Sequence, residues 1–352
     1  MDRRFYLDLA ESGLRMPIGA DLVLHEKEDV EAIKCDGKRL GAIIEETARR
    51  FNTPLAIPLM DLMLEKQTLL NMLDVPADQI PTWHFSSCPA PEILETVDRR
   101  IMEPYGPRLK ANVDAVSYIA KETDLLPVAM SIGPFSLMTK LLSDPITPVY
   151  ESGTGMSARD SPEICTVERA LEMSIRVILQ SITAQLEVGA KAVMIAEPAA
   201  NRVFFSPKQL AKGSDIFERY VMVYNRRIRQ LCREYDADLL FHCCGELVED
   251  MVRNFASLDS AVLSLGSSRV LWEDTALVPP TTVLYGNLPS KSFYSDEIIT
   301  IQQVEEKACE LITRMKQANH PFILGSECDV LSVPGCQSMI MSKVEAFVNC
   351  SC

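Results

Sequence analysis

Seven short, uninterrupted apolar runs recur along the chain, and they constrain its fold more than any other feature. Each run ends in a polar residue or a glycine and is followed by a helix-like segment. Continuous apolar runs of this length are typical of strands buried on both faces, as in a parallel sheet. They are PLAIPLMD (54–61), LLPVAMSIGPF (125–135), AKAVMIAEP (190–198), ADLLFHCCG (237–245), SAVLSLG (260–266), TTVLYGNL (281–288) and PFILGSEC (321–328). A less clear eighth strand is expected around TWHFSS (82–87).

The segments between the runs have the period of amphipathic helices. The clearest apolar stripe, which Gly189 ends, consists of Val167, Leu171, Ile175, Ile178, Ile182 and Leu186. Further helices are expected near 301–315 and 337–349. Alternation of helices with seven or eight strands favours an α/β fold of the (β/α)8 TIM-barrel type. An open Rossmann-type sheet is the alternative, but no G-x-G-x-x-G motif follows any run.

The first fifty residues differ from the rest of the chain, because they are polar, mixed and helical in character. We expect residues 1–50 to form a helical extension packed on a single barrel domain over residues 51–352. A hydrophobic content of 47% is ample for one large core.

Composition argues against several classes of protein. A formal net charge of −14 disfavours nucleic-acid binding, which needs a basic face. No apolar stretch approaches 18 residues, so no membrane span is expected. The N-terminal MDRRFYLDLAESG lacks the apolar core of a signal peptide. Eleven cysteines without such a signal are typical of the thiols of a cytoplasmic protein rather than of a disulfide framework.

The polar residues at the ends of the runs are the candidate site. In a (β/α)8 barrel the active site lies at the C-terminal ends of the strands. The residues at these positions are Asp61, Glu197, His242 with Cys244, Asn287, and Cys328. We therefore expect them to converge on one rim.

The stretch FHCCGE (241–246) contains the most specific pattern. Residues two apart on a strand face the same side, so His242 and Cys244 would face together and Cys243 would pack against the outer helices. With Cys328 at the end of the last strand, one imidazole and two thiolates make a zinc set with an open fourth position. The alternative is a buried histidine among ordinary buried thiols. A redox pair of Cys243 with Cys244 is disfavoured, because adjacent strand side chains point apart.

Six motifs extend these local patterns over residues 40–349. They are LMDLMLEKQTLLNML (59–73), SIGPFSLMTKLL (131–142), IAEPAANRVFFSPKQLAK (195–212), LLFHCCGE (239–246), VLYGNLPS (283–290) and ILGSECDV (323–330). In this order they resemble the uroporphyrinogen decarboxylase superfamily, and within it the zinc-dependent corrinoid methyltransferases that act on coenzyme M. The H-x-C-G motif with the late G-x-x-C is the specific part of the resemblance.

The resemblance implies a zinc ion held by His242, Cys244 and Cys328, with the substrate thiol in the fourth position. Glu197 is the first candidate for that position when no substrate is bound. Glu246 and Glu327 are alternatives.

Four further residues are expected to contribute at the rim. Asp61, Asn287 and Ser131 would position the reactants, with Ser131 and Gly133 on the corrinoid side. Asp61, Asn287 and Ser131 could equally be ordinary caps at the ends of strands.

The activity implied is transfer of a methyl group from a methylated corrinoid to a small thiol such as coenzyme M. Tetrahydrofolate as acceptor, metal-free decarboxylation, and a non-catalytic corrinoid- or thiol-binding module are the alternatives. The arginine-rich stretch of the decarboxylases is missing from MDRRFYLDLAESGLRMPIG (1–19), and IAEPAAN has glutamate where the family more often has aspartate. No histidine lies in a D-x-H-x-x-G motif, so methylcobalamin would arrive free or on a separate corrinoid protein.

Overall fold

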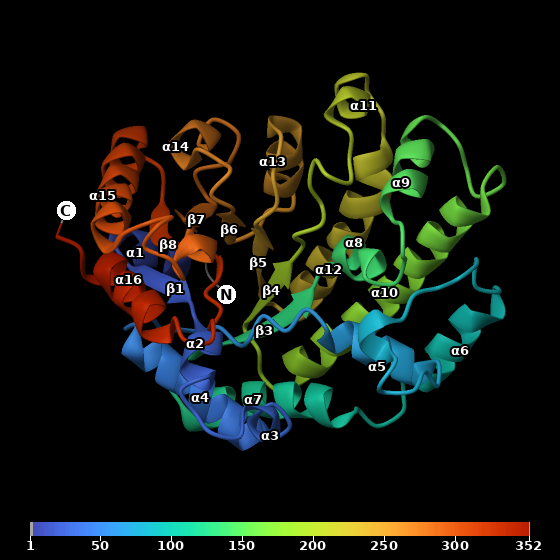
Figure 1. The fold of residues 1–352 in the computed structure, drawn as a ribbon, viewed down its shortest axis with the longest axis horizontal. Coiled ribbons are helices and arrows are strands. Elements are labelled where there is room, and N and C mark those ends of the chain that lie inside the picture. Colours follow the sequence, from blue (N-terminus) through green and yellow to red (C-terminus); the bar gives the residue numbers. More distant parts are fainter. Residues whose placement is uncertain (1–2, 352) are drawn as a thin grey trace.

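Eight parallel strands form one curled sheet in the computed structural model, which describes residues 3–351 (Figure 1). The strands are β1 (Arg15–Ile18), β2 (Leu55–Ala56), β3 (Leu126–Ile132), β4 (Ala192–Ala196), β5 (Asp238–Cys243), β6 (Val262–Leu265), β7 (Val283–Leu288) and β8 (Phe322–Asp329). Their order is β1-β8-β7-β6-β5-β4-β3-β2, and every hydrogen-bonded pair is parallel. This is the strand arrangement of a (β/α)8 barrel, as the sequence predicts.

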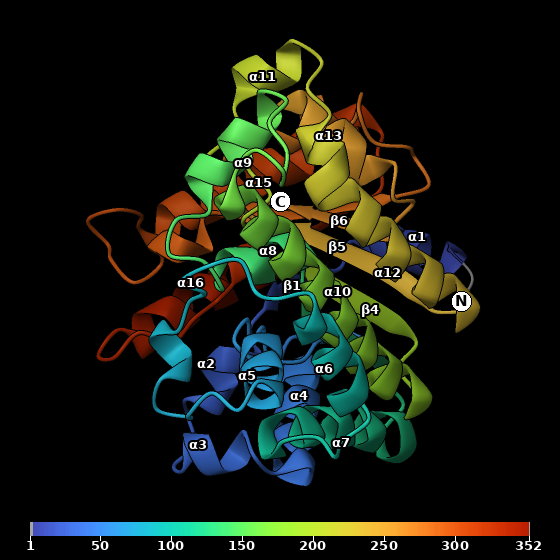
Figure 2. The ribbon, with the colours of Figure 1, turned by 90° about the vertical axis from the view of Figure 1, so that its right-hand side faces the viewer.

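Helices connect the strands and cover the outer side of the sheet (Figure 2). They are α1 (Arg4–Glu11), α2 (Ala20–Leu24), α3 (Val30–Ile33), α4 (Gly37–Arg50), α5 (Leu64–Met72), α6 (Glu92–Arg100), α7 (Pro107–Glu122), α8 (Pro134–Thr139), α9 (Ile146–Gly153), α10 (Pro162–Glu187), α11 (Pro207–Ala211), α12 (Val223–Glu234), α13 (Glu249–Ala256), α14 (Leu271–Asp274), α15 (Ile301–Ala318) and α16 (Gln337–Asn349), with short turns η1 (Ile80–Thr82), η2 (Glu218–Met222) and η3 (Ser290–Ser292). The three helices predicted from periodicity correspond to α10, α15 and α16.

The N-terminal segment contains a strand in addition to the helices of the predicted extension. Its helices pack on the barrel, but Arg15–Ile18 is a strand that pairs with β8 at the edge of the sheet. Conversely, the expected strand at 82–87 is wrong, because Thr82 is the last residue of η1 and residues 83–87 are irregular. The true eighth strand is therefore β1, which lies beside β8 in Figure 1.

The two edge strands approach each other without a backbone ladder between them. β2 is only two residues long, between Pro54 and Pro58, and proline cannot donate a ladder hydrogen bond. The hydroxyl of Thr53, before β2, lies 3.0 Å from the sulfur of Met16 on β1. Side chains of both edges therefore line the same central core.

Side chains alternate between this central core and an outer layer under the helices. On β5, Leu240 packs into the central core, whereas Phe241 and Cys243 pack in the outer layer. The prediction that Cys243 behaves as a small buried hydrophobe is confirmed, since it is fully buried there. Burial raises the pKa of its thiol well above the usual value.

Cys88 and Cys165 depart from the expectation of thiols alone. They form a disulfide across 77 residues, with their Cα atoms 5.7 Å apart. It ties the segment after η1 to the first turn of α10. Spacing in sequence could not reveal this pair, because the two residues meet only through the tertiary fold.

No helix within residues 3–351 has the length and apolar character needed to cross a membrane.

Candidate metal centre

His242, Cys244 and Cys328 meet at one end of the sheet. One ligand atom from each lies within 4.8 Å of those of the other two. His242 is on β5, Cys244 follows the end of that strand, and Cys328 is the penultimate residue of β8. The three residues lie far apart in the sequence and come together in the fold.

The imidazole of His242 is oriented for a metal. It is fully buried, and its Nδ1 lies 2.8 Å from the hydroxyl of Ser264, its register partner on β6. Its Nε2 is buried without a hydrogen-bond partner among the described residues. When Nδ1 donates its proton to Ser264, Nε2 carries a lone pair and can bind a metal. An unpartnered buried nitrogen beside two sulfurs fits a zinc ligand set.

The thiol pKa values of Cys244 and Cys328 are shifted in opposite directions. The hydrogen bond from Cys328 lowers the pKa of Cys244, with smaller contributions from His242 and the charge of Lys291 that act against burial. The same hydrogen bond and burial raise the pKa of Cys328. Without a metal, the pair thus favours one thiolate at Cys244 that accepts a hydrogen bond from the Cys328 thiol. A metal would displace that remaining proton.

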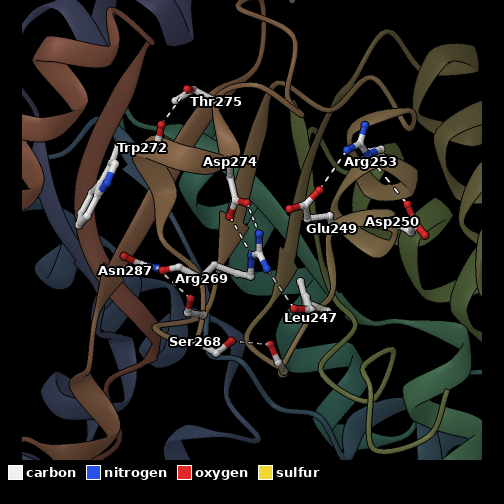
Figure 3. A network of polar contacts seen from close by, with 12 residues as sticks. Leu247, Glu249, Asp250, Arg253, Ser268, Arg269, Trp272, Asp274, Thr275 and Asn287 are labelled. Carbon is white, nitrogen blue, oxygen red and sulfur yellow. Dashed lines mark hydrogen bonds and ion pairs between the residues drawn. The ribbon is translucent and has the colours of Figure 1, made fainter. Parts of the chain in front are cut away.

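The loop after β6 supports Cys244. A Cβ atom on Gly266 would lie 2.7 Å from the carbonyl oxygen of Cys244, so only glycine allows this approach. The side-chain amide of Asn287 on β7 donates to the carbonyls of Gly266 (2.8 Å) and Arg269 (2.9 Å). Figure 3 shows Asn287 beside this loop, which the ion pair of Arg269 with Asp274 also holds. We expected the amide of Asn287 to position a reactant. In the structure this amide instead holds the loop after β6.

Lys291 and Glu327 complete the charges beside the cysteines. The ammonium of Lys291, half exposed, lies 3.4 Å from the carbonyl oxygen of Cys244 and 3.9 Å from the carboxylate of Glu327. Burial lowers the pKa of Lys291, but the charges of Cys244, Glu327 and Cys328 outweigh it and raise the pKa above its usual value. Glu327 is buried and accepts hydrogen bonds from the backbone N–H (3.1 Å) and the hydroxyl (2.6 Å) of Ser267. Lys291 thus remains a cation at the site.

Glu197 lies outside the ligand group. Its carboxyl is fully buried at the start of α8, where it accepts from the N–H groups of Ser136 (2.6 Å) and Phe135 (3.3 Å) and from the amide of Asn225 (3.1 Å). Burial raises the pKa of Glu197, while these hydrogen bonds act to lower it. The placement gives no support to Glu197 as the fourth ligand, because its oxygens are already engaged on the helix side of β4.

The other two carboxylates considered for the fourth position are also engaged elsewhere. Glu246 is largely exposed and forms an ion pair of 2.7 Å with Arg202. Glu327 is bound to Ser267, as described above, and is not among the three residues whose ligand atoms cluster.

The remaining predicted positions have structural partners. The carboxylate of Asp61 pairs with Arg108 and accepts from the N–H of Met63. The hydroxyl of Ser131 donates to Glu65 (2.7 Å) on the helix side of β3. A Cβ atom on Gly133 would lie 2.2 Å from a carboxylate oxygen of Glu197, so this glycine makes room for Glu197.

Two residues of the centre were missed from the sequence. Ser264 is the polar residue inside the run SAVLSLG, and its hydroxyl in a buried strand was the available signal. Lys291 follows β7 in a stretch that has no pattern of its own.

Comparison with known proteins extends this description. The family described as Uroporphyrinogen decarboxylase (URO-D) matches residues 36–350. The comparison with curated proteins gives no match.

Two solved structures share the fold to different degrees. A methyltransferase from Methanosarcina mazei is similar over 98% of both chains, with a TM-score of 0.64 and 15% sequence identity. The 3-keto-D-glucoside 4-epimerase YcjR from E. coli covers 75% of this chain and 97% of its own, with a TM-score of 0.37 and 16% identity. The first likeness agrees with the barrel described here, and the second is too distant to carry an argument. With a family match over nearly the whole chain, the protein belongs to the uroporphyrinogen decarboxylase family.

Proposed function

We propose that this chain is a methyltransferase that moves a methyl group from a methylated corrinoid to a small thiol such as coenzyme M. The observation that carries the proposal is the meeting of a ring nitrogen of His242 and two cysteine sulfurs within 4.8 Å of one another. Three such ligands leave a fourth position for a substrate, as in catalytic zinc sites. The likeness in fold to the Methanosarcina methyltransferase is consistent with this activity.

A Zn²⁺ ion held by His242, Cys244 and Cys328 would bind the incoming thiol and lower its pKa, so that the thiolate forms at neutral pH. The thiolate sulfur would attack the methyl carbon of the corrinoid, and its lone pair would form the carbon–sulfur bond while the electrons of the cobalt–carbon bond stay with the corrinoid. The proton of the thiol would pass to solvent.

The chain's own residues supply position and charge for this reaction. Ser264 fixes the orientation of His242, and the loop held by Asn287 supports Cys244. The cation of Lys291 partly offsets the negative charge of the sulfurs. Holding two reactants in line accounts for a large part of catalysis in such transfers. The corrinoid would arrive at the barrel mouth free or on a separate protein.

The N-terminal arginines do not support the alternative activity, decarboxylation of a porphyrinogen, which would need arginines to bind the substrate carboxylates. Arg3 donates to the carbonyl of Thr281 (3.3 Å) and pairs with Asp259 (2.9 Å), both of which precede strands. Arg4 pairs with Asp8 at 2.6 Å. These arginines are occupied at the opposite end of the barrel from the cysteines, where they could not bind substrate carboxylates.

The test combines metal analysis with turnover. Protein purified without chelators should contain about one zinc ion per chain. It should also convert the visible spectrum of methylcobalamin in the presence of coenzyme M. The Cys328→Ser variant should lose both zinc and turnover.

Cys243→Ala is the matched control, because Cys243 neighbours Cys244 on the chain but faces the outer layer. It should keep the zinc and the turnover. Zinc-free wild-type protein, or a Cys328→Ser variant with full activity, would overturn the proposal. Binding of methylcobalamin without spectral conversion would favour a non-catalytic module instead.

A further inference from the structure

Lys66 on α5 is a buried cation that has no carboxylate partner. The residue is 2% exposed, and its ammonium donates to the carbonyl of Pro81 at 3.2 Å. Among residues 3–351, no carboxylate lies within ion-pair distance of it. An ammonium has three donors, and a buried charge left unpaired is strongly unfavourable. The fold therefore retains at Lys66 a charge that the chain itself does not balance.

A second fully buried lysine within residues 3–351 does have an anionic partner. Lys343 on α16 is 0% exposed, and its ammonium lies 2.8 Å from the carboxylate of Asp296 and 2.9 Å from the carbonyl of Phe293. Lys66 resembles it in burial and in having a carbonyl partner, but it lacks the anion.

Two further basic side chains lie near Lys66. The backbone N–H of Phe85 donates to the carbonyl of Leu141 at 2.9 Å, which brings the segment containing Pro81 and His84 against Lys140 at the end of α8. Burial, and then the charge of Lys140, lowers the pKa of Lys66. Burial, and then the charge of Lys66, lowers the pKa of His84. Lys66 thus repels both Lys140 and His84 when the groups are charged.

Acidic groups near this cluster do not neutralise it. Asp61 acts on Lys140 and raises its pKa, but burial dominates and leaves the pKa of Lys140 below its usual value. The Asp61 carboxylate is itself paired with Arg108, which adds a further cation.

The basic cluster lies at the same end of the barrel as the metal centre. α5 and α8 follow the C-terminal ends of β2 and β3. The backbone N–H of Met60, next to Asp61, faces the carboxyl of Asp329, which follows Cys328 on β8. A molecule at the barrel mouth could therefore contact both the cluster and the cysteines.

We propose that Lys66, Lys140 and His84 form an oxyanion subsite, which takes the phosphate, sulfonate or carboxylate group of a molecule bound at the barrel mouth. The bound anion supplies the charge that Lys66 lacks, and the half-buried Lys140 and exposed His84 give it access from solvent. Anions of this kind carry several acceptor oxygens and match a cluster of nitrogen donors.

Binding of inorganic phosphate tests the subsite independently of turnover. Phosphate should raise the melting temperature of the wild-type protein by about 2 °C or more relative to sodium chloride of equal ionic strength. The rise should be lost in Lys66→Met and reduced in Lys140→Gln. In phosphate-free buffer, Lys66→Met should be at least as stable as the wild type, because it removes an unbalanced charge.

Lys343→Met is the matched control. It should melt at a lower temperature than the wild type and should still gain the full rise from phosphate. A wild-type protein without the rise, or a Lys66→Met variant that keeps it, would overturn the subsite. A Lys66→Met variant that is less stable in phosphate-free buffer would also overturn it, since the contact with Pro81 would then be the role of Lys66.

Pairs of substrates that differ only in the anionic group can show whether the anion belongs to the methyl acceptor or to the methyl donor. This extension rests on the proposed methyl transfer. A sulfonate site for the acceptor predicts that 2-mercaptoethanesulfonate has a lower KM than 2-mercaptoethanol, and that Lys66→Met removes the difference. A phosphate site for the donor predicts the same pattern for methylcobalamin against methylcobinamide, which lacks the phosphate. If phosphate binds but neither preference is found, the subsite stands and its assignment to these two substrates falls. If no turnover occurs at all, the proposed function fails while the phosphate result still decides the subsite.

Discussion

Nδ1 of His242 lies 2.8 Å from Oγ of Ser264, directly across the β5–β6 ladder, and Nε2 is the ring nitrogen left without a hydrogen-bond partner among the described residues. A hydrogen bond of this kind fixes both the tautomer and the rotation of a ligand imidazole. The contact depends on the inward side chains of two neighbouring strands, so it belongs to the barrel framework rather than to a loop.

Ser264→Ala should therefore weaken zinc binding while leaving the three ligands in place. Loss of such a supporting contact typically costs about 10–100-fold in metal affinity. The affinity can be measured by competition with a chromophoric chelator. Ser131→Ala, which removes another buried strand hydroxyl on the helix side of β3, should leave zinc affinity unchanged. Equal affinities for the wild type and Ser264→Ala would show that Ser264 does not orient the imidazole.

The metal-free protein should react with alkylating agents at Cys244 even below pH 7. The hydrogen bond from Cys328 lowers the pKa of Cys244, so its thiolate persists at a pH where an ordinary thiol is almost wholly protonated. Iodoacetamide labelling at pH 6, located by peptide fragmentation, should favour Cys244 over the exposed Cys35.

Two further measurements make that result specific. Cys328→Ala removes the hydrogen-bond donor and should shift labelling of Cys244 to higher pH, and zinc should suppress labelling in the wild type. Labelling that rises only above pH 8 in the wild type would contradict the unequal sharing of protons.

The barrel could be predicted because its buried strands are continuous apolar runs. All seven runs contain a strand. The strand that the runs do not include is β1, and its properties show what such a pattern cannot detect. β1 is four residues long, contains Pro17 and pairs only with β8, about three hundred residues away. A short edge strand with proline has no local signal, because its pairing is decided by the closure of the sheet.

The site could be predicted in part for a related reason. Strand parity places His242 and Cys244 on one face, and this follows from local geometry alone. The direction of a side chain at a strand end depends instead on the segment that follows. Glu197 turns toward the start of α8 rather than the barrel mouth, and the run IAEP contains nothing that distinguishes the two directions.

Gly133→Ala should destabilise the fold, because its Cβ would lie 2.2 Å from a carboxylate oxygen of Glu197. Forced shifts of this size cost about 1–3 kcal/mol in the free energy of unfolding. Gly106→Ala is a matched control, since both glycines precede a proline that begins a helix, and the nearest atom to a Cβ on Gly106 is 3.8 Å away. Urea denaturation should show a clear loss for the first variant and little change for the second. Similar stabilities would mean that Glu197 can move away without cost.

Glu65 should make the protein less stable as pH rises from about 5 to 8. Its carboxyl is buried, one oxygen accepts from Ser131 and Ser181, and the other has no partner among the described residues. Burial raises the pKa of Glu65 from 4.5 to about 7. The folded state therefore holds a proton that the unfolded state releases between these two values, and stability falls with pH across that window before levelling off above it.

Glu65→Gln should remove this part of the pH dependence, because the amide is neutral and its oxygen can still accept from both serines. The difference in unfolding free energy between Glu65→Gln and the wild type should be small at pH 4.5 and should grow to about 3 kcal/mol in favour of the variant at pH 8. Urea denaturation at both pH values measures it, and taking the difference cancels the other titrating groups. Glu197→Gln provides the contrast, since both oxygens of Glu197 accept from N–H donors and an amide nitrogen would face one of them. That variant should be less stable than the wild type at either pH, whereas a Glu65→Gln variant with the same pH profile as the wild type would show that Glu65 does not titrate in this window.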